Sequence, residues 1–312
     1  MRFEQLSITF FSLPHLVTCH RYNSPEEEAK RFKVFVENLK VIDERNAVDT
    51  AVHGVTRFSD LTQEEFAGRY LKALPKKKPE VPPIGLPKPL TATVDVNWAG
   101  VYTTPVKNQG YCGSCWAFSA TEQIESNYWM SSGDEQILSP QQITSCDATA
   151  YGCNGGWTEH AYEYVIRAGG IETDATYPYT SGTAGITGSC KSNSKEYVVA
   201  IGGYETVSSS ASGETAMANY VAATGPLSVC VDAQTWSSYT GGIVTKCGNS
   251  VDHCVQAVGL NTATAGTPYW IVRNSWGVTW GNAGYIYLEY GANMCDIASD
   301  ATYVTGAVAY GQ

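Results

Sequence analysis

The sequence predicts an α+β fold in which a helical part precedes a β-rich part. Helix-like patterns run over Cys115–Met130, Ser139–Ser145 and Trp157–Ala168, whereas residues from about 197 to 290 alternate Tyr, Val and Ile between glycine-containing turns. Helices and strands that are segregated along the chain are typical of the α+β class. A proline- and lysine-rich stretch, Leu74–Leu90, has no hydrophobic period and is expected to be an extended, exposed linker.

The part before this linker is expected to contain a long helix. Six residues recur there at steps of four, four, three, four and four, which puts them on one helical face; they are Glu27, Arg31, Phe35, Asn38, Ile42 and Asn46. The spacing alone also fits an ordinary amphipathic helix. A second, short helix is expected after Thr62, because Thr62 can cap it and Glu65 follows three residues later.

Charge divides the chain at the same linker. Residues 1–90 carry 14 Lys and Arg against 12 Asp and Glu, a net charge of +2, whereas residues 91–312 carry 6 and 18, a net charge of −12. A domain this acidic is a poor candidate for binding nucleic acid. It should attract the more basic N-terminal part at neutral pH, and protonation of its carboxylates in acid should weaken that attraction.

The cysteine content indicates an oxidising compartment, because ten cysteines in 312 residues are unusual for a chain kept in reducing conditions. The apolar run Ile8–Val17 is interrupted by Pro14, so residues 1–21 are interpreted as a poor signal peptide or a mis-assigned N-terminus. No run of about 18 apolar residues occurs, and no membrane span is expected.

Candidate chemistry is concentrated at Cys115. The stretch Gln109–Phe118 places this cysteine at the start of an apolar, helix-like run. A thiol becomes a nucleophile where a helix N-terminus or a protonated imidazole lowers its pKa. The spacing from Cys112 to Cys115 also occurs in zinc half-sites and redox pairs. However, no further ligands follow at zinc-like spacing, and residues 103–108 read as a loop rather than the strand that precedes a redox pair.

Two candidate partners of this thiol lie at the ends of β-like runs. His253 is near the start of Asp252–Gly259, and Asn274 follows the run that begins at Trp270. His253 lies 138 residues after Cys115 (253 − 115) and Asn274 lies 159 after it (274 − 115). A single histidine at a strand end is more often structural than catalytic, so the inference depends on all three positions together.

Together these motifs resemble the papain-like cysteine proteases. Cys112–Trp116 reads C-G-S-C-W, the pattern around the nucleophile of that family, whose His and Asn follow about 130–150 residues downstream. The helical face in the N-terminal part matches all six positions of the ERFNIN motif of cathepsin L-like propeptides. Gly54–Asp60 resembles the propeptide motif GxNxFxD, with Thr56 in place of its asparagine. The likeness runs from about Ser24 to the C-terminus and indicates a cathepsin L-like zymogen.

The resemblance implies a papain-like fold of two lobes, a helical left lobe and a β-barrel-like right lobe, preceded by a helical propeptide. Residues 22–90 would then be the inhibitory propeptide and its linker, and residues 91–312 the peptidase domain, with the mature start near Thr91–Thr93. No insertion resembling the loop that makes cathepsin B an exopeptidase follows Cys190, so an endopeptidase with an open cleft is expected.

The resemblance also assigns roles to individual residues. Cys115 corresponds to the nucleophile, His253 to the general base and acid, and Asn274 to the residue that orients the imidazole. Gln109 matches the glutamine whose amide faces the developing oxyanion. Trp276 matches the tryptophan that shields the His–Asn hydrogen bond, although simple core packing also explains a tryptophan there.

Three disulfides follow from the family pattern, which pairs Cys112 with Cys153, Cys146 with Cys190, and Cys247 with Cys295; sequence alone does not give the connectivity. Cys230 and Cys254 remain, both in apolar β-like runs. They are either two buried thiols, since free cysteine is often buried, or a fourth bridge.

Substrate contacts are expected from the loop before the third helix and from the β-rich part. Gly155 and Gly156 match the backbone strip that binds an extended substrate, and glycine allows its close approach. The remaining substrate-binding candidates, which include the walls of the P2 pocket, are Trp157, Thr158, Cys230, Asp252, Cys254, Trp276 and Asp300. Asp300 aligns with the pocket floor, where an acid accepts Arg at P2 as well as apolar groups. Alternatively, this short side chain turns to solvent.

The expected function is therefore a zymogen of a cysteine endopeptidase, located in a lysosome or vacuole or outside the cell. Its expected partners are protein or peptide substrates, its own propeptide as an intramolecular inhibitor, and cystatin-like inhibitors, and it is expected to be a monomer. No metal and no cofactor is expected. Two alternatives are a non-catalytic homologue of the same fold and a Cys-x-x-Cys redox protein.

Overall fold

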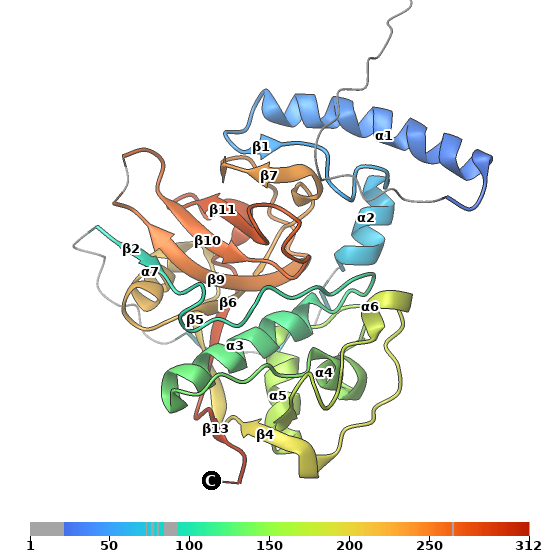
Figure 1. The fold of residues 1–312 in the computed structure, drawn as a ribbon. Helices are drawn as coiled ribbons and strands as arrows, with labels where there is room; N and C mark the ends of the chain where they lie inside the picture. The colour runs from blue at the N-terminus through green and yellow to red at the C-terminus, as the bar shows by residue number, and fades with distance from the viewer. Residues whose placement is uncertain are drawn as a thin grey trace, which may run out of the picture.

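The computed structural model describes residues 22–72, 74–75, 78–79, 81–83, 93–263 and 265–311. The expectations for residues 1–21 and for most of the linker lie outside these residues. The chain forms a strand-rich lobe and a helical lobe, with the N-terminal segment on top of the strand-rich lobe (Figure 1). No helix within the described part is both long and apolar enough to span a bilayer.

The N-terminal segment, which comprises the described residues between 22 and 83 and is called the prosegment below, contains the two expected helices. Helix α1 spans Pro25–Asn46, with Ser24 as its N-cap and proline in its first turn. Helix α2 spans Gln63–Tyr70, and the predicted capping box is confirmed, because Thr62 accepts from the backbone of Glu65 and the Glu65 side chain accepts from the backbone of Thr62. Strand β1, Val52–His53, lies between the helices.

The periodic face of α1 holds the prosegment together by binding the loop that precedes α2. The Asn38 amide donates to the carbonyls of Ser59 at 2.8 Å and Leu61 at 2.9 Å. Asn46 exchanges two hydrogen bonds with the backbone of His53. Arg31 pairs with Glu65 and thereby links α1 to α2. The helical spacing thus brings polar side chains, and not only apolar ones, to the contact face.

The strand-rich lobe is built on an open sheet with the order β5-β12-β6-β9-β10-β11-β8, and β2 pairs with β9 beside this path. Its strands are β2 (Asp95–Asn97), β5 (Gly203–Ser208), β6 (Leu227–Val231), β8 (Ile243–Val244), β9 (His253–Asn261), β10 (Tyr269–Arg273), β11 (Tyr285–Glu289) and β12 (Ala301–Thr305). The sheet does not close on itself, so the expected barrel-like lobe is an open sheet in this protein.

One helix of this lobe is not predicted by the sequence pattern. Helix α7, Glu214–Ala223, interrupts the part expected to be β-rich and packs against β9 and β5. Its residues Ala216, Met217, Ala218 and Val221 are all buried in the core. A ten-residue apolar run without a clear period fits a buried strand as well as a buried helix, and its alanines favour the helix.

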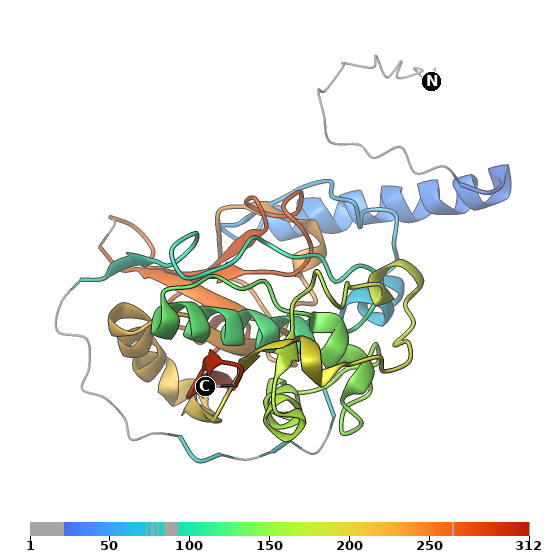
Figure 2. The same ribbon diagram turned by 60° about the horizontal axis from the view of Figure 1, so that its bottom comes forward.

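The helical lobe contains the three helices expected from the sequence: α3, Cys115–Ser132; α4, Pro140–Cys146; and α5, Thr158–Ala168. A short helix α6, Ser181–Ala184, and a three-stranded sheet of β3 (Ile171–Glu172), β4 (Tyr197–Ala200) and β13 (Val308–Ala309) complete it. Helix α3 is buried almost all round, because it packs on β9 of one lobe and on α5 of the other (Figure 2).

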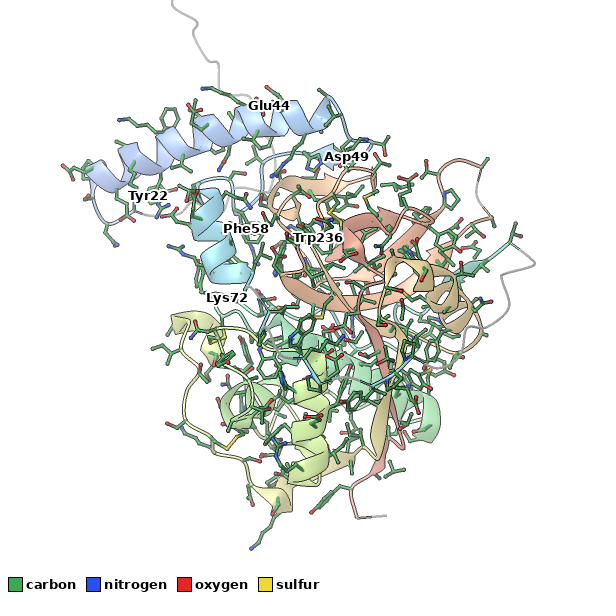
Figure 3. All side chains as sticks on the ribbon, turned by 180° about the vertical axis from the view of Figure 1, so that it is seen from behind. Tyr22, Glu44, Asp49, Phe58, Lys72 and Trp236 are labelled. Atoms are coloured by element: carbon green, nitrogen blue, oxygen red, sulfur yellow. A yellow bond between two sulfur atoms is a disulfide. The ribbon has the colours of Figure 1, made fainter. Side chains whose placement is uncertain are left out.

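The prosegment docks on the strand-rich lobe at several places. Strand β1 pairs with β7, Tyr239–Gly241, and Arg45 donates to the carbonyl of Thr235 and the hydroxyl of Ser238. Asp49, which lies just beyond the end of α1 (Figure 3), accepts from the backbone of Thr245 at 2.7 Å. Phe58, Phe66 and Tyr70 surround Trp276, the first two with ring centroids 5.4 Å from the indole.

Four disulfides are present, and three of them coincide with the pairing expected from the family pattern: Cys112–Cys153, Cys146–Cys190 and Cys247–Cys295. The fourth joins Cys230 of β6 to Cys254 of β9, which lie directly opposite each other in the sheet. The alternative of two buried thiols is therefore wrong. Among the described cysteines only Cys115 is free.

Candidate active site

Cys115 is the first residue of α3 and is completely buried in this form of the protein. Burial raises the pKa of its thiol to about 12, because a thiolate here would lose its hydration; backbone N–H groups of Cys254 and Trp116 oppose this shift in part. The cysteine is thus a neutral thiol while the prosegment is in place, at a helix end whose free N–H groups favour the anion.

His253 opens β9 and meets Asn274, which follows β10, the neighbouring strand of the sheet. The His253 Nε2 and Asn274 Oδ1 atoms are 2.8 Å apart. Burial lowers the pKa of His253 to about 4, although the bond to Asn274 opposes the shift, so the imidazole is neutral. Trp276 covers this pair, with its indole centroid 4.9 Å from the imidazole.

The side chain of Gln109 is oriented by Ser275, the residue that follows Asn274. Ser275 donates its hydroxyl to Gln109 Oε1 at 2.7 Å, which leaves the amide NH2 to donate elsewhere. That NH2 bonds to the carbonyl of Cys112 at 2.9 Å and to the carbonyl of Tyr70, a prosegment residue, at 3.2 Å. A backbone carbonyl of the prosegment therefore occupies a donor of the predicted oxyanion site.

The prosegment continues from Tyr70 across the site to the helical lobe, and Lys72 lies at this crossing in Figure 3. The backbone N–H of Lys72 donates to the carbonyl of Asp252 at 3.0 Å. Further on, the carbonyl of Pro75 accepts from the indole N–H of Trp157 at 2.7 Å. The prosegment thus contacts both lobes in the place where the sequence predicts a substrate.

Asp252 contributes its backbone to this contact, whereas its side chain turns inward. Its Oδ1 atom accepts from the backbone N–H of Ala233 at 2.9 Å. Burial raises the pKa of the Asp252 carboxyl to about 7. The predicted substrate role of Asp252 thus rests on its carbonyl, and its side chain binds the segment that follows β6.

The two glycines of the predicted backbone strip precede α5 and have separate structural reasons. Gly155 has φ of +106°, a conformation that other residues rarely adopt. Gly156 has ordinary φ, but a Cβ there would lie 2.5 Å from the ring of Trp116. Glycine is thus required at Gly155 by the backbone conformation and at Gly156 by the close approach of Trp116.

Asp300, which the sequence places at the floor of the P2 pocket, is buried and does not turn to solvent. Asp300 pairs with Lys78 of the prosegment, and its carbonyl accepts from the backbone N–H of Cys230 at 3.1 Å. Lys78 also lies 5.0 Å from the centroid of the Trp157 ring. Two residues of this pocket, Lys78 and Glu159, are not found by the sequence reasoning, because neither belongs to a motif.

Glu159 is the second acid of the pocket. It follows Thr158, whose hydroxyl donates to it at 3.3 Å, and it lies 2.9 Å from Lys78 Nζ. A glutamate in the first turn of a helix is ordinarily explained by the helix dipole, so the sequence offers no signal for its place in the pocket.

The comparisons with known proteins agree with this geometry. The family described as papain family cysteine protease matches residues 90–305, and the cathepsin propeptide inhibitor domain matches residues 19–66. Cysteine proteinase 1 of Dictyostelium discoideum is 36% identical over 308 residues, which cover 88% of this chain and 86% of that protein. A cysteine proteinase of Trypanosoma brucei brucei is 39% identical, and the match covers 88% of this chain but 62% of its own length.

Among solved structures, the digestive procathepsin L 3 of the Tenebrio molitor larval midgut superposes with a TM-score of 0.80 at 32% identity, covering 92% of this chain and 94% of that one. The recombinant stem bromelain precursor gives a TM-score of 0.78 at 33% identity and covers 92% of this chain and 94% of its own. We conclude from these matches that this chain belongs to the papain family of cysteine proteases and carries a cathepsin-type inhibitory propeptide.

Proposed function

We propose that this protein is the zymogen of an endopeptidase in which Cys115 is the nucleophile, His253 the general base and acid, and Asn274 the residue that orients the imidazole. The observation that carries this proposal is the prosegment carbonyl of Tyr70 on the amide of Gln109. A carbonyl held there mimics the oxygen of a scissile peptide bond. The bond from His253 to Asn274 supports the assignment of the pair.

In the proposed reaction the Cys115 thiolate attacks the substrate carbonyl carbon, and the oxyanion that forms accepts from the Gln109 amide and a backbone N–H. Protonated His253 gives its proton to the leaving amine, which departs with the breaking C–N bond. Water then attacks the thioester, His253 takes its proton, and the acid is released. Removal of the prosegment hydrates the site, which favours the thiolate–imidazolium pair over the two neutral groups seen here.

We further propose residues 22–90 as inhibitory propeptide and linker and residues 91–312 as the mature domain, cut near Thr91–Thr93. The P2 pocket would take apolar groups and, through Asp300, arginine; the burial of Asp300 supports this over a solvent-facing carboxylate. The disulfides and the propeptide fit a secretory, lysosomal or vacuolar location, with the mature enzyme a monomer open to cystatin-like inhibitors.

The decisive experiment is labelling of the processed protein with an epoxysuccinyl thiol inhibitor, followed by mass spectrometry. One label on Cys115 that blocks hydrolysis, and no label on Cys115→Ala, is the expected result. A labelled protein without hydrolysis would favour a non-catalytic homologue. Digestion of a long peptide should give internal cuts, and stepwise release of dipeptides alone would contradict an endopeptidase.

The oxyanion assignment has its own test. Gln109→Ala should lower kcat by roughly 10²–10³, as loss of one oxyanion donor does in other proteases. Ser275→Ala, which frees the Gln109 amide to rotate without removing it, is the matched variant and should cost less. Wild-type kcat in Gln109→Ala would remove Gln109 from the mechanism.

A further inference from the structure

We infer that Glu159 and Asp300 together form a two-carboxyl site for one basic side chain, filled by Lys78 in the zymogen and by lysine or arginine at P2 of a substrate in the mature enzyme. This inference rests on the proposed function and deepens it. The acids come from separate elements, the first turn of α5 and the loop before β12. The lysine comes from the prosegment, which is the part that processing removes.

The geometry at Lys78 is that of a bound cation. Its ammonium group contacts both carboxyl groups, and it lies over the Trp157 ring. The exposed fractions are 22% for the lysine side chain, 1% for Glu159 and 3% for Asp300. Carboxyl groups shielded to this degree give a charge-assisted contact that is stronger than one at the surface.

The site has capacity beyond what Lys78 uses. The Asp300 Oδ2 atom is buried and has no hydrogen-bond partner in the described structure. A single ammonium reaches one oxygen of Asp300, whereas a guanidinium carries five donors in a planar fork. Arginine therefore fits the two acids at least as well as lysine.

Removal of the prosegment leaves these acids without their cation. Burial raises the pKa values of both Glu159 and Asp300 above their ordinary range, and Lys78 opposes both shifts. The other titratable groups that face the pair are Tyr162 and Tyr204, whose pKa values burial raises, so both remain neutral. A basic P2 side chain pairs with these carboxyl groups when they are ionised, so its binding should strengthen as the pH rises through their pKa values.

The test uses the full chain after activation and matched peptides that carry lysine, arginine or norleucine at P2, because norleucine has a similar apolar stem without the charge. Glu159→Gln should lower the ratio of kcat/KM for lysine over norleucine by roughly ten- to a hundredfold and leave the norleucine value almost unchanged. Asp300→Asn should do the same. The ratio in the wild type should increase from pH 5 to pH 8.

The matched control is Glu163→Gln on the same helix, since Glu163 bonds to Tyr204 and not to Lys78. Titration of the active thiol with the epoxysuccinyl inhibitor counts the folded enzyme in every variant. An unchanged ratio in Glu159→Gln, with full thiol labelling, overturns the paired site even if Asp300→Asn lowers the ratio. Absence of hydrolysis of every peptide would instead overturn the proposed protease function.

Discussion

Two pairs of buried acids in this molecule are neutralised in different ways. Glu122 and Glu125 lie on α3 and face Arg273 and Lys107, which belong to the same domain. Glu159 and Asp300 face only Lys78 among the described cations, and Lys78 lies on the segment whose removal is proposed above. We infer that acids whose cations belong to the same domain have a structural role, whereas acids whose cation belongs to the prosegment form a binding site.

Glu122 and Glu125, with their cations Arg273 and Lys107, are part of a wider hydrogen-bond network. Glu125 accepts from the backbone of Leu138 at 2.8 Å and from Thr104, and Arg273 donates to the Thr104 carbonyl and to Gln256. Burial raises the pKa of Glu122 to about 7, although Arg273 and Lys107 oppose this shift. The network connects α3, which begins with Cys115, to the strand that leads to Asn274.

The largest effect on stability should come from separating Glu122 from Arg273. Arg273→Met leaves Glu122 buried without its cation, and such a change typically costs about 3–5 kcal/mol. The free energy of unfolding measured with denaturant should fall by that amount, or the protein should fail to accumulate. A variant as stable as the wild type would mean that this pair is also dispensable, and the contrast between the two sites would disappear.

The second effect concerns the disulfide between Cys230 and Cys254, two residues predicted to line the P2 pocket. The double variant Cys230→Ala/Cys254→Ala removes a bridge whose residues are 24 apart, and the loss of a loop of that length costs about 3 kcal/mol. Unfolding should therefore require less denaturant, while the P2 ratio of lysine over norleucine should change little. A large change in that ratio would show that the disulfide shapes the acid pair.

The third effect concerns the rate at which the prosegment is released, which depends on Lys78 and not on the stability of the fold. The contact of Lys78 with ionised carboxyl groups exists above their pKa values and is lost as the pH falls through them, and burial has raised those of both Glu159 and Asp300. Prosegment release should thus accelerate on acidification. The Lys78→Met variant should release its prosegment faster than the wild type at pH 7, and its release rate should depend less on pH. The Lys78→Arg variant should release its prosegment at the wild-type rate. Equal release rates in all three proteins would contradict this.

The smallest effect is expected from an acid outside both pairs. Glu163 lies one turn along α5 from Glu159, only partly buried, and bonds to Tyr204 at 3.2 Å. Glu163→Gln should change the free energy of unfolding by less than about 0.5 kcal/mol and should not alter the P2 ratio. A change in that ratio would mean that general negative charge, rather than the pair, attracts the basic side chain.

The sequence predicts the local elements of this fold well and the long-range pairs poorly. The helix of the ERFNIN positions and the Thr62 cap follow from periodicity and capping, and the start of α3 at Cys115 follows from the apolar run that begins there; all of these are local properties. Helix α7 was missed because an alanine-rich apolar run fits both classes of element. The β-rich lobe was predicted, but its strand order and the fact that its sheet stays open depend on pairings that no local pattern encodes.

The acid pair shows the same limit at the level of single residues. Positions 78, 159 and 300 come from three distant parts of the chain, and each has an ordinary local explanation as a linker lysine, a helix-start acid or a loop acid. Only Asp300 could be placed from a family motif. The combination becomes visible when the fold brings the three side chains together.

The aromatic contact described for the prosegment has a further consequence. Phe58, Phe66 and Tyr70 enclose the indole of Trp276, which is completely buried. When the prosegment leaves, all three rings leave with it and water reaches this tryptophan. The fluorescence of the chain should then shift to longer wavelength, so that a natural chromophore in the protein reports the moment at which the cleft opens.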